Sequence, residues 1–160
     1  FVVNLIRPIP FVILLAALSP VMLQTIGTSI GIKAGIFAMV VAATFAISRI
    51  VEQNLVSIDP GVIEAARAMG ASKLRIMFSV MLPEALGPLI LGYTFIVIGV
   101  VDMSAMAGAV GGGGIGDFAI RYGYQRFDWN VTLVAIIIIV ILVQLVQLVG
   151  NLLARKIMRR

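Results

Sequence analysis

The side chains that could support chemistry in this chain are few, and the usual catalytic types are missing. The 160 residues include no cysteine and no histidine, which excludes disulfides, thiolate metal sites, cysteine nucleophiles and imidazole bases. Gly111, Gly113 and Gly116 match the phosphate-binding pattern G-x-G-x-x-G, but that pattern works between a buried strand and a helix. Here it follows a long apolar stretch, so we predict a flexible or tightly turned segment on the outer face, near the mouth of a translocation path. We predict no catalytic residue, no cofactor and no metal site.

Three other polar side chains are unusual because they lie inside long apolar stretches. A charged group within a membrane-spanning helix costs roughly 2.5–3.5 kcal/mol, so Asp102 should face protein or water, and a solvated position near the membrane surface is the simpler alternative. Gln144 and Gln147, together with Asn151, recur at i, i+3 and i+7 and therefore share one helix face. That face either lines a polar path or hydrogen-bonds another helix. Asp102, Gln144 and Gln147 are our candidates for such a path.

The elements that must position these side chains are membrane-spanning helices. The chain is 61% hydrophobic and 12% charged, whereas soluble domains carry about 25% charged residues. A helix needs about 20 mostly apolar residues to cross a hydrocarbon core of about 30 Å, and the stretches that qualify are residues 4–22, 34–51, 83–105 and 131–153. Prolines in the first and third stretches predict bends or irregular starts there. The fold class is an all-α integral membrane protein, with one transmembrane domain over residues 1–160.

The start of the chain and its basic residues predict how these spans are arranged. The sequence opens at Phe1 without an initiating methionine, and we expect one further span upstream. Cytoplasmic loops are enriched in lysine and arginine, and a cytoplasmic C-terminus places most of the basic residues inside: Arg7, Arg49, Arg67, Lys73, Arg75, Arg155, Lys156, Arg159 and Arg160, with Lys33, Arg121 and Arg126 outside.

This sorting also bears on the partners of the chain. The aromatic residues Tyr122, Tyr124, Phe127 and Trp129 fall on the outer side, where an interfacial belt is expected. The net charge of +5 is divided by membrane side rather than gathered in one stripe, so membrane lipid is an expected partner and nucleic acid is not.

Residues 59–83 are predicted to form a cytoplasmic loop of two short helices. Asp59 can cap a helix that begins at Pro60, and one apolar face of that helix follows from the spacing of Val62, Ala65, Ala66 and Met69. Gly70 supplies a left-handed turn, Ser72 can cap the second helix, and Pro83 opens the next span. By spacing alone the loop can equally lie on the bilayer surface with its basic residues at anionic headgroups.

The order of residues in this loop resembles a known signature. Glu64-Ala65-Ala66, three residues, Gly70, nine residues and Val80-Met81-Leu82-Pro83 is similar to the cytoplasmic loop of the permease subunits of bacterial ABC importers, with Val80 where isoleucine is more common. The resemblance implies the ABC importer permease fold and a coupling helix that docks on an ATP-binding subunit. The contact residues it implies are Glu64, Ala65, Ala66, Met69, Gly70, Leu82 and Pro83. ATP hydrolysis would belong to the partner, so this chain is not expected to be an enzyme.

Longer runs resemble the methionine importer permeases. They are residues 4–11, 27–31, 63–72 and 104–111, followed by the glycine run and residues 121–124. The resemblance implies a five-span subunit of the bacterial inner membrane, of which four spans are present here. Its partners would be a second copy of the permease, two ATP-binding subunits and a periplasmic or lipid-anchored methionine-binding protein. The implied function is methionine import by alternating access. The alternatives are a permease for another amino acid or a small peptide, and a channel or assembly subunit that is not linked to ATP.

Overall fold

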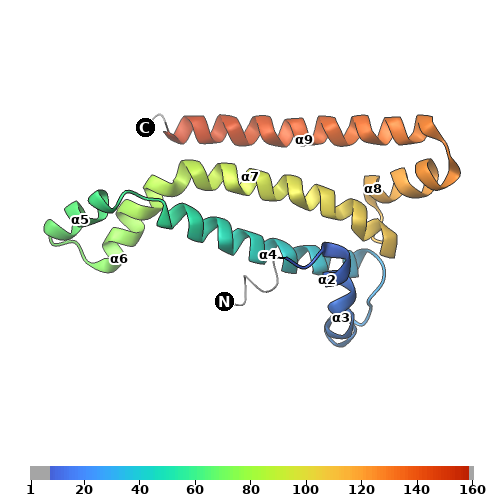
Figure 1. Cartoon of the computed structure of the whole chain (residues 1–160), viewed down its shortest axis with the longest axis horizontal. Helices are drawn as coiled ribbons and strands as arrows, with labels where there is room; N and C mark the ends of the chain where they lie inside the picture. Colours follow the sequence, from blue (N-terminus) through green and yellow to red (C-terminus); the bar gives the residue numbers. More distant parts are fainter. Residues whose placement is uncertain (1–7, 159–160) are drawn as a thin grey trace.

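The computed structural model describes residues 8–158, and it places them in helices joined by short connections, without strands. Three long helical segments lie side by side and alternate in direction (Figure 1). They are α4 (Ile32–Val56), the continuous helical stretch Lys73–Ala107, which includes α7 (Leu82–Ala107), and α9 (Trp129–Met158). Each is long and apolar enough to cross a membrane. The prediction of an all-helical membrane fold is confirmed, and all three helices extend beyond the predicted spans.

The first predicted span, residues 4–22, is not one continuous helix over the part that the structure describes, and the irregularity predicted from its prolines is confirmed. Two short helices, α2 (Phe11–Ala17) and α3 (Ser19–Ile26), occupy it and continue past its predicted end. Pro20 lies in the first turn of α3, where it lacks the N–H that would carry α2 onward. Both helices still pack on α4, since Phe11 and Met22 share a buried cluster with Ala38. Residues 4–7 of this prediction lie outside the described residues.

The central helix of the three is α7, which packs against α4 on one side and α9 on the other. Small residues set the distance between these helices. A Cβ atom built on Gly150 of α9 would come within 2.8 Å of Thr94 Cβ on α7, and a Cβ on Gly92 of α7 would collide with Ile50 on α4. Close backbone approach of this kind is how membrane helices gain packing energy where apolar burial alone gives no advantage over lipid.

The connection from α7 to α9 folds back on the C-terminal end of α7. It contains η2 (Gly108–Val110), α8 (Gly114–Phe118), η3 (Ala119–Gly123) and η4 (Tyr124–Arg126). The glycine pattern lies here, and it follows a helix rather than a strand. Gly111 and Gly113 have positive φ angles, and a Cβ on Gly116 would overlap the backbone of Ala105. The prediction of a turned segment is therefore confirmed, and this glycine run lacks the strand that a nucleotide site needs.

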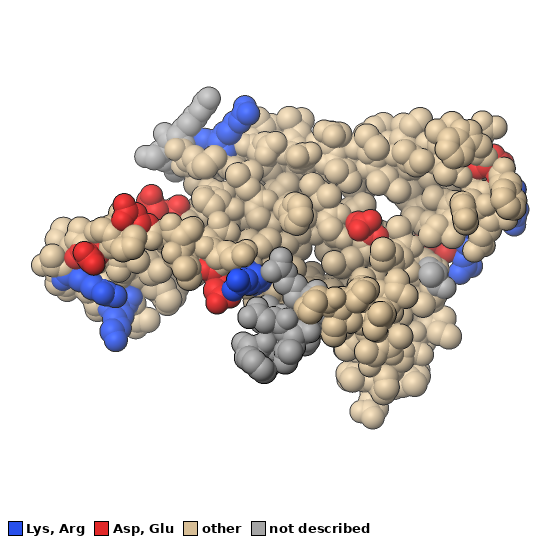
Figure 2. All heavy atoms as spheres, in the orientation of Figure 1, with Lys and Arg blue, Asp and Glu red and all other residues tan. Residues whose placement is uncertain are grey.

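Two ends of the molecule can be distinguished. The loop between α4 and α7 and the end of α9 lie at one end, and α8 lies at the other (Figure 1). The loop and the C-terminal region thus lie at the same end of the molecule, and their cytoplasmic position stays a prediction. Charged side chains gather towards the two ends and leave most of the surface between them uncharged (Figure 2). Arg7, Arg159 and Arg160 lie outside the described residues.

Candidate functional site

The loop of residues 59–83 begins and ends its first helix through local hydrogen bonds. In α5 (Pro60–Ala68), the Asp59 carboxylate accepts a hydrogen bond from the Gly61 N–H at 2.8 Å. Gly70 has a φ of 78°, and the Ala71 N–H donates to the Ala66 carbonyl at 3.1 Å across this left-handed turn. Ser72 then caps α6 (Lys73–Ile76) by accepting from the Arg75 N–H. The predicted caps and turn are confirmed, and they fix the shape of the loop.

Side-chain burial divides the predicted apolar face of α5 in two. Ala66 is buried, on the side where α5 contacts α6 and η1 (Met77–Met81). Val62 and Ala65 are exposed, and Met69 is 81% exposed. The other predicted contact residues, Glu64, Gly70, Leu82 and Pro83, are exposed as well. Ala66 therefore supports the loop from inside, while the remaining residues are accessible to a partner.

The predicted boundary at Pro83 is not a break, which corrects the expectation that the loop ends and a new helix starts there. The helix runs without interruption from Lys73 to Ala107. A π-helical turn, η1, ends at Met81, two residues before Pro83, and the Leu82 N–H donates to the Met77 carbonyl five residues earlier. The wider turn accommodates a proline ring that would clash with the carbonyl four residues before it in an α-helix. The second half of the loop is thus one continuous helical segment with α7.

Asp102 lies near the outer end of α7, as predicted. Its side chain is exposed, and it lines a cavity of about 430 Å³ between α7 and α9 whose walls include Phe95, Ile139 and Val143. Its carboxylate makes no ion pair within residues 8–158. A role for Asp102 in a transport path stays a prediction.

Gln144 and Gln147 share a face of α9 with Asn151, since α9 is helical throughout this region. This face lies beside the seam with α7 rather than in it, because the buried residues of the seam are Ala135, Gly150 and Ala154. All three amide side chains are exposed and make no hydrogen bond within the described chain. Both interpretations of these amides, as a polar path or as contacts to a further helix, stay predictions.

The sequence and this architecture match those of known proteins. The family described as binding-protein-dependent transport system inner membrane component matches residues 1–159. The chain belongs to this family. It is 41% identical to the probable D-methionine transport system permease protein MetI of Vibrio cholerae, over 98% of this chain and 69% of that protein. It is 40% identical to the methionine import system permease protein MetP of Bacillus subtilis, over 99% of this chain and 72% of that one.

A solved structure of the MetNI methionine ABC transporter in an inward-facing conformation superimposes with a TM-score of 0.92 and 43% identity. The match covers 98% of this chain and 72% of the solved one. The chain is thus a multi-pass inner membrane component with the fold of an ABC importer permease, as the resemblance implied.

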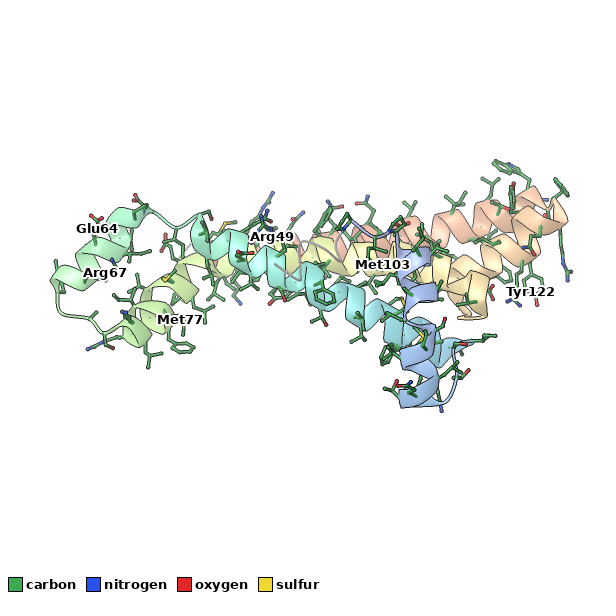
Figure 3. All side chains as sticks on the ribbon, turned by 60° about the horizontal axis from the view of Figure 1, so that its bottom comes forward. Arg49, Glu64, Arg67, Met77, Met103 and Tyr122 are labelled. Atoms are coloured by element: carbon green, nitrogen blue, oxygen red, sulfur yellow. The ribbon has the colours of Figure 1, made fainter. Side chains whose placement is uncertain are left out.

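One feature of this membrane component escaped sequence reasoning. Arg49 was counted only as a basic residue near the end of the predicted span 34–51, but α4 continues to Val56 and leaves Arg49 seven residues from its end. It lines a groove of about 490 Å³ between α4 and α7. We call this the Arg49 groove, and its walls include Ala46, Arg49, Gln53, Asn54, Phe95 and Met103. Figure 3 shows Arg49 and Met103 between the loop end, with Glu64 and Arg67, and the Tyr122 end. An arginine at the edge of an apolar run, followed by two amides, was the available signal.

Proposed function

We propose that this chain is the permease subunit of an ATP-driven importer for methionine and that it forms the translocation path by alternating access. Two relatives of about 40% identity are named methionine transport permeases. The observation that carries the proposal is the continuous helix Lys73–Ala107. It joins an exposed apolar loop surface at one end of the molecule to the centre of the three-helix layer.

The loop would couple the permease to an ATP-binding subunit. Short rigid helices that dock in a groove pass on a rigid-body displacement, which a flexible segment would absorb. The exposed residues Glu64, Ala65, Met69, Gly70, Leu82 and Pro83 are the proposed contacts, and buried Ala66 holds α5 in place. ATP hydrolysis would take place in the partner, so this chain carries no catalytic group of its own.

The two ends of the molecule would face different partners. The excess of basic residues at the loop end favours a cytoplasmic position for the loop and the C-terminal region. A methionine-binding protein, periplasmic or lipid-anchored, would then deliver substrate at the α8 end. A second copy of the permease and two ATP-binding subunits complete the transporter, with membrane lipid around it.

The substrate assignment is tested by uptake. The full-length permease, assembled with its ATP-binding subunits and binding protein in vesicles, should accumulate labelled methionine when ATP is present on the cytoplasmic side. Excess unlabelled methionine should abolish the signal. If other amino acids compete and methionine does not, the chain belongs to an importer of another specificity.

The coupling role is tested by a charge placed on the docking surface. Met69→Asp should reduce co-purification of the ATP-binding subunit by 10-fold or more, since a buried unpaired charge at an interface typically costs more than 1.4 kcal/mol. Phe127→Asp is the matched control, because Phe127 is 94% exposed at the opposite end of the molecule and should tolerate the same change. Equal co-purification of both variants would contradict the proposed docking surface.

A further inference from the structure

Arg49 has hydrogen-bonding capacity that the described chain does not use. Its Nη1 donates to Glu52 Oε2 at 2.7 Å, one turn along the same helix. Its Nε is buried and has no hydrogen-bond partner within residues 8–158. A guanidinium offers five N–H donors and pairs with a carboxylate through two of them side by side. Nε is therefore an unpaired donor beneath the surface, and the exposed part of the guanidinium, which belongs to a side chain that is 32% exposed, is what the Arg49 groove offers to a ligand.

The unpaired Nε donor of Arg49 bears on function because Arg49 lies within a spanning helix. The residue lies seven positions before the end of α4 at Val56, which is roughly 10 Å along a helix. An ionisable residue within a spanning helix is a functional-site hypothesis by default, because its charge must be met by protein, water or a ligand. The Glu52 carboxylate balances the charge of Arg49 only in part, because the Glu52 side chain is 61% exposed to solvent. The Arg49 side chain is 32% exposed.

The rest of the groove suits an amino acid with an apolar side chain. Asn54 Nδ2 donates to the Ile50 carbonyl at 2.8 Å, so the amide oxygen of Asn54 remains as an acceptor for an ammonium group, as does that of Gln53. The opposite wall supplies Phe95 and Met103 of α7. Aromatic rings and thioethers make favourable contacts with apolar and sulfur-containing chains. The groove volume of about 490 Å³ falls in the range of about 300–1,000 Å³ that is typical of small-ligand sites.

We propose that the Arg49 groove binds the substrate amino acid during transit, with its carboxylate on the exposed N–H groups of the Arg49 guanidinium and its apolar side chain against α7. This inference rests on the proposed function and adds a substrate site within the permease itself. The competing explanation is that Arg49 serves only as the helix partner of Glu52. Removing Glu52 separates the two, because a ligand site should keep its ligand when Glu52 becomes neutral.

Site-directed thiol protection tests the site directly. The 160-residue sequence has no cysteine, so a cysteine placed in the groove is a clean reporter in this part of the chain. Gly99 lines the groove, and a Cβ there meets no atom within 4 Å. In the full-length transporter without nucleotide, methionine should slow maleimide labelling of Gly99→Cys. Gln125→Cys, exposed at the other end of the molecule, should label at a rate that methionine does not change.

Variants of the ion pair then define the mechanism. Arg49→Gln in the Gly99→Cys background should raise the methionine concentration needed for half protection by about 10- to 100-fold, as expected for a lost charge-assisted pair. Glu52→Gln should leave protection intact or improve it, and Lys33→Gln, which removes a charge from the same helix, should have no effect. Methioninol, which lacks the carboxylate, should protect poorly.

Several outcomes would overturn the site. They are absence of protection by methionine, equal protection in the Arg49→Gln background, equal protection by methioninol, and the same loss in Glu52→Gln as in Arg49→Gln. Vesicle uptake by the wild-type transporter keeps the two proposals apart. Methionine uptake without protection removes the site alone, whereas failure of methionine uptake removes the proposed function.

Discussion

Replacing Gly150 by alanine should separate α7 from α9 and destabilise the permease. Gly150 is buried where α9 crosses α7, and a Cβ built there would lie 2.8 Å from Thr94 Cβ. Ordinary van der Waals contact begins at 3.4 Å, so the helices must part by about 0.6 Å at this point. Thr94 cannot rotate away from the contact, because its Cβ is fixed to the helix backbone and its hydroxyl donates to the Ile90 carbonyl at 2.7 Å.

The size of the effect follows from a comparison with Gly99→Ala. Both changes replace a helical glycine by alanine, which stabilises a helix by roughly 0.5–1 kcal/mol. A Cβ on Gly99 meets no atom, so Gly99→Ala should be neutral or stabilising. Gly150→Ala carries the additional cost of overpacking, typically about 1–3 kcal/mol. The difference between the two variants isolates that packing cost.

Thermal unfolding of the full-length permease in detergent measures this difference. At roughly 2–4 °C per kcal/mol, the Tm of Gly150→Ala should fall several degrees below that of Gly99→Ala. Thr94→Ala added to Gly150→Ala should recover part of the loss, because it removes two of the three crowded atoms. Equal Tm values for the two single variants would refute the packing that we describe between α7 and α9.

Three further predictions concern the loop and the path. Asp59→Ala removes the cap of α5 and should lower the stability of that helix by about 1 kcal/mol, which faster amide exchange in α5 would show. The control Asp128→Ala removes hydrogen bonds at the start of α9 and should leave amide exchange in α5 unchanged. Gly70→Val forces a β-branched residue into a φ of 78°, at a cost of about 1–2 kcal/mol, and should increase protease cleavage in the loop; unchanged cleavage would contradict the strained turn. Asp102→Asn should keep methionine uptake within twofold of wild type if the carboxylate is solvated, and a tenfold loss would show that the path depends on its charge.

The loop of residues 59–83 shows how much of a structure local sequence patterns can predict. Asp59, Gly70 and Ser72 act on backbone groups within a few residues, so their roles could be predicted from the chain alone. The burial of Ala66 beside exposed Met69 could not, because both lie on one apolar face and only the packing of α5 on α6 and η1 separates them. The helix through Pro83 was missed because a π-turn depends on a shift in hydrogen bonding that leaves no mark in hydrophobic periodicity.

The sequence by itself indicated that the chain is a membrane protein and where three of its four predicted spans form long helices, since these properties depend on hydrophobicity summed over neighbouring residues. It also carried the loop signature that led to the family. The tertiary structure decided that residues 11–26 form two short helices packed on α4, that Gly150 meets Thr94, and that the Nε of Arg49 is buried without a partner. These facts depend on which distant segments become neighbours, and a close contact between helices is a property of both surfaces rather than of either sequence alone.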